Sequence, residues 1–166
     1  MRIWWPLWLA VSGLGACASY DGRTLVPGKS TAAEVEATMG IPADRQVRAD
    51  GTIWWYPRGP VGFHTYAVRI GPDGIVRDIE QRLTVENLGK VVAGKWTKQD
   101  VRDLFGPPFL TAYMPRQQRE VWEYQLRDNV DFRWKLWIQF SEDGIAREVV
   151  KLRHPDEDPP GMPGKE

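Results

Sequence analysis

The sequence predicts an α+β fold arranged as a tandem repeat, each unit packing one or two short helices on a three- to four-stranded antiparallel sheet. The segment LVPGKSTAAEVEATMGIP at 25–42 matches VVAGKWTKQDVRDLFGPP at 91–108. Further on, IWWY at 53–56 matches VWEY at 121–124, and AVRIGPDGIVR at 67–77 matches WIQFSEDGIAR at 137–147. The offset between matching positions rises from 66 through 68 to 70 residues, which indicates small insertions in the second copy.

The repeat sets the predicted boundaries. We expect a signal peptide at 1–16, a tether at 17–24, unit 1 at 25–85, unit 2 at 86–154 and a disordered tail at 155–166. The tail prediction rests on composition, because HPDEDPPGMPGKE from His154 is acidic, rich in Pro and Gly, and has almost nothing apolar to bury.

One helix is predicted in each copy of the repeat. Thr31 and Thr97 are each followed three residues later by an acidic residue, which is the spacing of a capping box. Gly40 and Gly106 follow about nine residues later, and we expect each to end its helix in the left-handed conformation. A further short helix is predicted at 85–92.

The strands are predicted from runs of β-branched and aromatic residues. They are expected at 52–57, 65–71 and 75–83 in unit 1 and at 120–126, 132–140 and 145–152 in unit 2, with an additional strand considered at 45–49. Asp73-Gly74 and Asp143-Gly144 are tight-turn signals between the last two strands of each unit. The residues expected to form two cores beneath the helices are Trp54, Tyr56, Val68 and Ile70, and their counterparts Trp122, Tyr124, Ile138 and Phe140.

The N-terminus has the order of charge, apolar run and small residues that is typical of a secretory signal. The run at 3–11 is about half the roughly 20 apolar residues that a membrane-spanning helix needs. The stretch LGAC at 14–17 resembles the bacterial lipobox. This resemblance implies that Cys17, the only cysteine, carries lipid such as palmitate, and that the following Ala18 directs the protein to the outer membrane, facing the periplasm. The alternative is a leftover thiol near an ordinary cleavage site, or a small buried core residue.

Composition and motifs exclude several functions. The chain has 22 basic and 22 acidic residues and no basic run, so no nucleic-acid partner is expected. Only His64 and His154 are histidines, and no closely spaced metal ligands or nucleophile–base grouping occur. The sequence GKS at 28–30 lacks the first glycine of a phosphate-binding loop, since Arg23 stands there. We therefore predict no catalytic residue, no metal and no cofactor, and hence no enzyme.

Aromatic residues next to arginines are the candidate partner-binding groups, because exposed Trp and Arg are typical of interfaces. Strand alternation places Trp55 and Trp137 on the face opposite the core residues. We predict a partner-binding sheet face formed by Trp55, Trp134 and Trp137 with Arg69 and Arg133. Arg58 and Phe63 belong to YPRGPVGFH at 56–64, a loop without counterpart in the second copy, and could meet lipid headgroups or a partner. The alternative is that the two repeats, or their loops, cover these rings.

The motif Gly-Lys-x-Thr-x-x-x-Val, then Gly-x-Pro, Trp-x-Tyr and a closing hairpin with Gly resembles the SmpA/OmlA family of outer-membrane lipoproteins, which includes BamE. It occurs once per repeat, over 25–83 and 91–153, although BamE itself has one unit and the family commonly has methionine at Lys29 and Lys95. The resemblance implies a role in outer-membrane β-barrel assembly and envelope integrity, with envelope proteins such as the β-barrel assembly machinery as partners. The tandem arrangement also resembles β-lactamase inhibitory proteins, which implies as an alternative a binder of a periplasmic enzyme.

Overall fold

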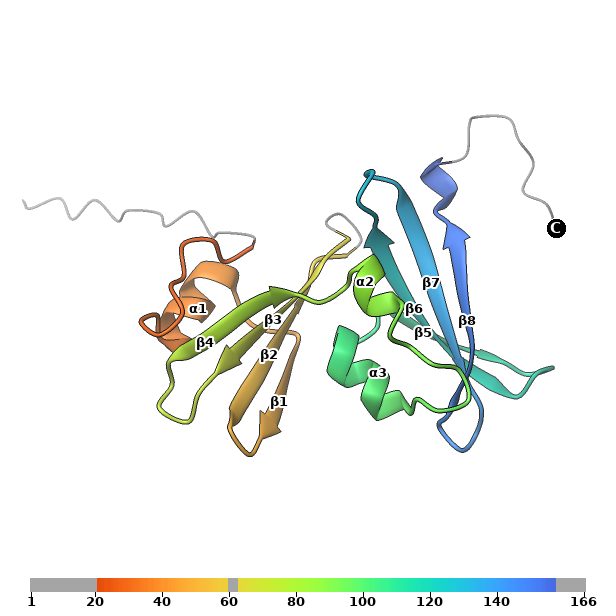
Figure 1. Ribbon diagram of the computed structural model, residues 1–166, viewed down its shortest axis with the longest axis horizontal. Helices are drawn as coiled ribbons and strands as arrows, with labels where there is room; N and C mark the ends of the chain where they lie inside the picture. The colour runs from red at the N-terminus through yellow and green to blue at the C-terminus, as the bar shows by residue number, and fades with distance from the viewer. Residues whose placement is uncertain (1–20, 60–62, 158–166) are drawn as a thin grey trace, which may run out of the picture.

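The computed structural model describes residues 21–59 and 63–157 (Figure 1). This part of the chain forms two four-stranded antiparallel sheets with short helices, so the predicted α+β tandem fold is confirmed. Cys17 and the predicted signal peptide lie outside the described residues, as does the tail from 158 onwards.

The two units repeat the same order of elements. Unit 1 contains α1 (Ala32–Met39) and sheet 1, which is formed by β1 (Asp44–Arg48), β2 (Gly51–Pro57), β3 (Thr65–Ile70) and β4 (Val76–Gln81) in that spatial order. Unit 2 contains α2 (Val85–Leu88), α3 (Lys98–Phe105) and sheet 2, which is formed by β5 (Leu110–Met114), β6 (Arg119–Arg127), β7 (Arg133–Phe140) and β8 (Ala146–Arg153). A 3₁₀ helix, η1 (Pro155–Glu157), follows.

The predicted strands are all present, and the strand considered at 45–49 is β1. Its counterpart β5 was not predicted from the sequence. The run LTAYM follows two prolines and is short, so it carries little strand signal of its own, and its pairing with β6 is what holds it extended.

Both longer helices begin with the predicted capping box. The Glu34 carboxylate accepts the backbone N–H of Thr31 at 2.6 Å, and the Asp100 carboxylate accepts that of Thr97 at 2.8 Å. At the other end, Gly40 has φ 85° and ψ −169°, and Gly106 closely matches it. The positive φ of both glycines is as expected. Their ψ angles differ from those of the left-handed helical conformation, because the chain leaves each helix in an extended conformation towards the next strand.

Each helix covers one face of its own sheet and closes a separate core. The eight residues expected in the two cores lie there, with Trp54 half-buried at the edge and the others buried. Burying one such apolar side chain contributes about 1.5–3 kcal/mol, so packing rather than helix propensity stabilises helices of this length. The hydroxyls of Tyr56 and Tyr124 donate to the carbonyls of Gly40 and Gly106 at 3.1 and 3.0 Å, which ties each core strand to the end of its helix.

The described elements stack in four layers: α1, sheet 1, α3 and sheet 2 (Figure 1). The helix α3 therefore has protein on two sides. Val101 and Phe105 are buried in the core of its own unit. On the other side, Arg102 pairs with Asp44 of β1 at 2.9 Å, and Asp103 pairs with Arg48 of the same strand.

Three predicted boundaries need correction. The tether was expected to reach residue 24, but Gly22 is buried, and a Cβ there would meet the Met39 sulfur at 2.9 Å, so the chain packs on unit 1 from this point. Disorder was expected from 155, but Arg133 holds η1 through Asp156 and Glu157 at 3.0 and 2.5 Å. The predicted helix at 85–92 is the shorter α2.

Replacing Gly106 with alanine should cost more stability than the same change at Gly40. Both glycines have positive φ, which costs another residue of order 1–3 kcal/mol. Only at Gly106 would the added Cβ overlap another side chain, since it would lie 2.4 Å from the Trp55 ring. We expect Gly106→Ala to lose roughly 1–3 kcal/mol more than Gly40→Ala in urea unfolding. Equal losses would contradict the contact between the units.

Candidate protein-interaction face

Trp55 is buried between the two units, contrary to the prediction that it lies on an exposed face. Its side chain is 0% exposed, and the ring lies against Gly106 at the end of α3. The indole Nε1 finds no hydrogen-bond acceptor among the described residues. The alternative, that one repeat covers the rings of the other, is therefore correct for Trp55.

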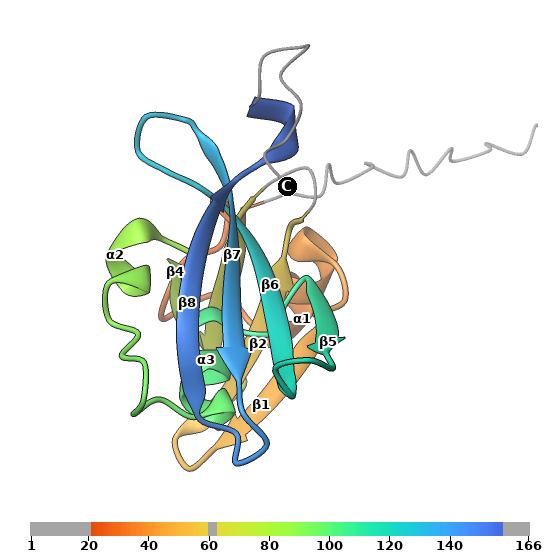
Figure 2. The same cartoon turned by 90° about the vertical axis from the view of Figure 1, so that its right-hand side faces the viewer.

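Trp137 occupies the equivalent position on sheet 2, where no described element covers it. The strand register pairs Trp137 with Glu123, as it pairs Ala67 with Trp55 in sheet 1, so the tryptophan has moved to the neighbouring strand. Trp137 is half-buried, and its indole N–H donates to the Glu123 carboxylate at 2.8 Å. Figure 2 shows β8, β7, β6 and β5 in front of the molecule, with α1, α2 and α3 behind them.

An apolar hollow of about 100 Å³ lies beside Trp137 on this surface. The hollow is lined by Leu110, Ala112, Met114, Val121, Glu123 and Trp137, and we call these six residues the outer face of sheet 2. Leu110 is 53% exposed, and β5 is an edge strand without a charged residue. Proteins normally protect such edges with charges or cover them, so an uncharged edge beside an apolar hollow indicates a binding surface.

The buried carboxylate of this face is fully satisfied. Burial raises the pKa of Glu123, but the hydrogen bonds from Gln125 and Trp137 and the charge of Lys135 outweigh it, and the pKa falls below the ordinary value of 4.5. Gln125 donates at 3.0 Å, and the Lys135 ammonium lies 3.4 Å away. The ionised carboxylate thus fixes the indole of Trp137 in place, and the centre of the face presents carbon to solvent.

The structure separates the other predicted residues from Trp137. Trp134 packs on the core of unit 2 and donates to Asp128 at 2.8 Å, with the Lys151 ammonium 3.8 Å from its ring centroid. Arg69 lines a different hollow, of about 300 Å³, on sheet 1 together with Arg48 and Arg77. The predicted single face of three tryptophans and two arginines is therefore wrong, and Trp137 is the one of these tryptophans that lies on a face without a described covering.

The two residues predicted to bind a partner or lipid from the loop, Arg58 and Phe63, instead make contacts within the protein. Phe63 is 4% exposed, and the guanidinium of Arg133 lies 5.8 Å from its ring centroid. On the other side of this ring, His154 makes an edge contact at 5.4 Å, so the loop of unit 1 is fixed on unit 2. Arg58 donates to the carbonyl of Met39 at 3.1 Å. Neither Arg58 nor Phe63 is presented to lipid or to a partner as expected; residues 60–62 lie outside the described part.

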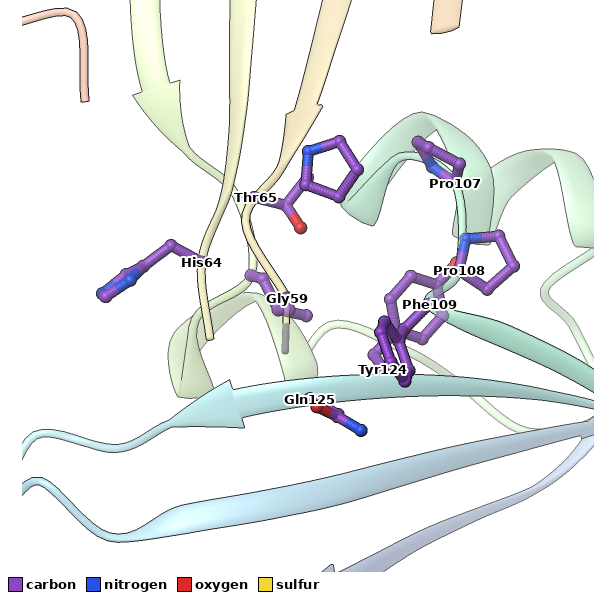
Figure 3. Close-up of a pocket in the computed structure, with 10 residues that line it drawn as sticks. Gly59, His64, Thr65, Pro107, Pro108, Phe109, Tyr124 and Gln125 are labelled. Carbon is purple, nitrogen blue, oxygen red and sulfur yellow. The ribbon is translucent and has the colours of Figure 1, made fainter. Parts of the chain in front are cut away.

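The junction between the units contains a small cavity of about 140 Å³ (Figure 3). Pro107, Pro108 and Phe109 line it from unit 2, and Thr65 from unit 1, while the His64 imidazole points away from the prolines. Small-molecule sites are usually about 300–1,000 Å³, so this cavity suits a few waters rather than a substrate. Among the described residues, no three His, Cys, Asp or Glu side chains gather in a way that could hold a metal ion.

Comparisons with known proteins add little. No family model and no curated protein matches the chain. Among solved structures it is similar to a DUF4309 family protein (YjgB) from Bacillus subtilis subsp. subtilis str. 168, with 21% identity, covering 80% of this chain and 84% of that one, at a TM-score of 0.32. None of the helices in the described ranges is long and apolar enough to cross a membrane.

Replacing Glu123 with glutamine should remove one acid-sensitive component of stability. Because folding lowers the pKa of Glu123, its contribution is complete above pH 4.5 and is lost as the pH falls through the lower folded value. We expect the free energy of unfolding to decline less between pH 5 and about 3 in Glu123→Gln than in the unsubstituted protein. Glu86→Gln, on the exposed side of α2, serves as control. Parallel pH profiles for Glu123→Gln and the parent would argue against this network of hydrogen bonds and an ion pair around Glu123.

Proposed function

We propose that this chain is a lipid-anchored protein of the bacterial outer membrane, facing the periplasm, that acts by binding other proteins and catalyses no reaction. The anchor would be acylated Cys17, which the lipobox-like stretch before it supports. The chain from Gly22 is packed on unit 1, so at most about four residues after the cysteine separate the folded part from the membrane surface. Such a short connection would hold the two units close to the inner leaflet of that membrane.

The outer face of sheet 2 is the observation that supports binding. On sheet 1 the same face is a protein-binding surface already, because it receives α3 through Trp55 and two ion pairs. On sheet 2 the same face carries Trp137 and an apolar hollow without a described covering. Interfaces bury such apolar centres, ringed by satisfied polar groups, and tryptophan is prominent among the residues that dominate binding energy.

We propose that the partner belongs to the envelope and that the protein supports outer-membrane β-barrel assembly and envelope integrity. The motifs that resemble the SmpA/OmlA family, present once per unit, support this role. The inhibitor-like alternative depended on one concave sheet made from both units. Sheets 1 and 2 are separate and have α3 between them, so that particular surface is absent from the described residues.

Capture from gently solubilised envelopes tests the proposal. With Cys17 intact and a C-terminal tag, we expect the β-barrel assembly machinery to be enriched. Met114→Lys places a charge in the apolar hollow and should lower this capture by about tenfold or more, as loss of a central interface contact does. Val130→Lys is the matched control, because Val130 is 73% exposed at the β6–β7 turn, away from the hollow.

Two results would contradict the proposal. Enrichment of one unrelated periplasmic enzyme would favour the inhibitor-like function instead. Equal capture by Met114→Lys and Val130→Lys would place the binding surface somewhere other than on sheet 2. Circular dichroism of both variants establishes that they are folded before the comparison is made.

The anchor has a separate test. Replacing Cys17 with serine removes the only acylation site that the sequence offers. We expect the variant to leave the membrane fraction and appear in the soluble periplasmic fraction, because the lipid on Cys17 is the anchor that the lipobox-like stretch implies. Membrane retention equal to that of the unsubstituted protein would contradict lipid anchoring.

A further inference from the structure

The outer surface of α1 is the exposed equivalent of the α3 surface that packs on sheet 1. In α3 this surface consists of Arg102, Asp103 and Gly106, with Pro107 following at the junction cavity. An offset of 66 residues gives Glu36, Ala37, Gly40 and Ile41 as the equivalents in unit 1. Ala37 and Gly40 are exposed, and Ile41 is 86% exposed, which is unusual for isoleucine.

The glycine that ends each helix shows the difference most directly. At Gly106 an added Cβ would lie 2.4 Å from Trp55, whereas at Gly40 it would meet nothing within 4 Å. The two glycines share the same backbone conformation, with φ of 77° and 85°. A surface shaped like the one that binds a sheet is therefore present on α1 but has no described sheet against it.

The surface of sheet 2 equivalent to the one that receives α3 is likewise not covered by any described residue. Trp55, paired across the strands with Ala67, receives Gly106 on sheet 1, and the equivalent cross-strand pair on sheet 2 is Glu123 with Trp137. Among the described residues, the outer face of sheet 2 therefore has no helix packed against it, and the outer surface of α1 has no sheet packed against it.

We propose that α1 of a second copy of this chain docks on the outer face of sheet 2, repeating between molecules the α3–sheet 1 interface that each molecule contains. This continues the established interface by one layer, so the order α1, sheet 1, α3, sheet 2 is followed by α1 of the next copy. The contact is heterologous, and such contacts build open chains or closed rings rather than two-fold dimers. The inference shares with the proposed function only the outer face of sheet 2 as a binding surface, and rests on it in that respect alone.

The side chains on the two proposed surfaces differ in charge from their equivalents in the contact within the molecule, and they differ in a matching way. Inside the molecule Asp103 faces Arg48, and both are charged. Between molecules their equivalents are Ala37 and Met114, and both are uncharged. Glu36 is the equivalent of Arg102, and it is already paired with Arg45 of its own unit, so it brings no unpaired charge to the hollow. The uncharged part of this surface, Ala37 with Ile41, would thus meet the apolar hollow of sheet 2, which favours burial of both.

Disulfide formation between two single-cysteine variants tests the geometry. The variants are Ala37→Cys and Met114→Cys in the mature chain, residues 17–166, each with Cys17→Ser so that no native thiol remains. We expect the mixture to form a crosslinked dimer under mild oxidation at least tenfold faster than either variant alone. The control is Ala37→Cys mixed with Val130→Cys, whose cysteine lies at the exposed β6–β7 turn.

The outcomes are distinct. A mixed dimer formed no faster than the control overturns the inference, and so does preferential self-crosslinking of each variant, which would indicate a two-fold interface. If the chain stays monomeric at every concentration in sedimentation experiments, the inference is also overturned. A second copy would then not cover the outer face of sheet 2.

Ile41→Arg separates self-association from the proposed function. This substitution, two residues beyond the end of α1, should weaken self-association by at least tenfold without lowering envelope capture, whereas Met114→Lys should weaken both. Self-association without envelope capture would mean that the proposed function fails and the inference stands. Envelope capture with no self-association in the parent would mean the reverse.

Discussion

The packing of Trp55 on Gly106 is the contact on which the arrangement of the two units depends. A ring that is 0% exposed fits there because the residue at the end of α3 has no side chain, and a Cβ would come within 2.4 Å of the ring. The pairs that Arg102 and Asp103 make with β1 fix α3 along the same face. Since exposed or half-exposed ion pairs contribute little, the buried aromatic contact is the larger stabilising interaction.

This contact also decides which surface of the molecule is free. Two similar units each have a helix on one sheet face and an open second face. When α3 of unit 2 occupies the open face of sheet 1, the equivalent face of sheet 2 is left without a described covering. Within the described residues, the tandem arrangement therefore leaves uncovered the sheet face with Trp137 and the apolar hollow, and the outer surface of α1.

Much of the fold could be predicted from the sequence because its determinants are local. The capping boxes at Thr31 and Thr97, the glycines that end the helices and the alternating core residues all act within a few positions. The strand β5 was missed because its pairing partner, rather than its own residues, holds it extended. The positions of the helix ends were predicted correctly, but the ψ angles of Gly40 and Gly106 were not, because ψ depends on the direction that the chain takes after the helix.

The candidate site could be predicted only in part, because burial at the junction depends on how one unit packs on the other. Alternation correctly placed Trp55 and Trp137 opposite the cores, but nothing local distinguishes the tryptophan that α3 covers from the one left open. The most direct test is a photo-crosslinking residue at Ala112 on sheet 2, compared with one at Val47, an exposed residue of β1, in intact cells. Covalent products with a defined envelope protein or a second copy from Ala112 alone are predicted; products from Val47 and none from Ala112 would contradict the account.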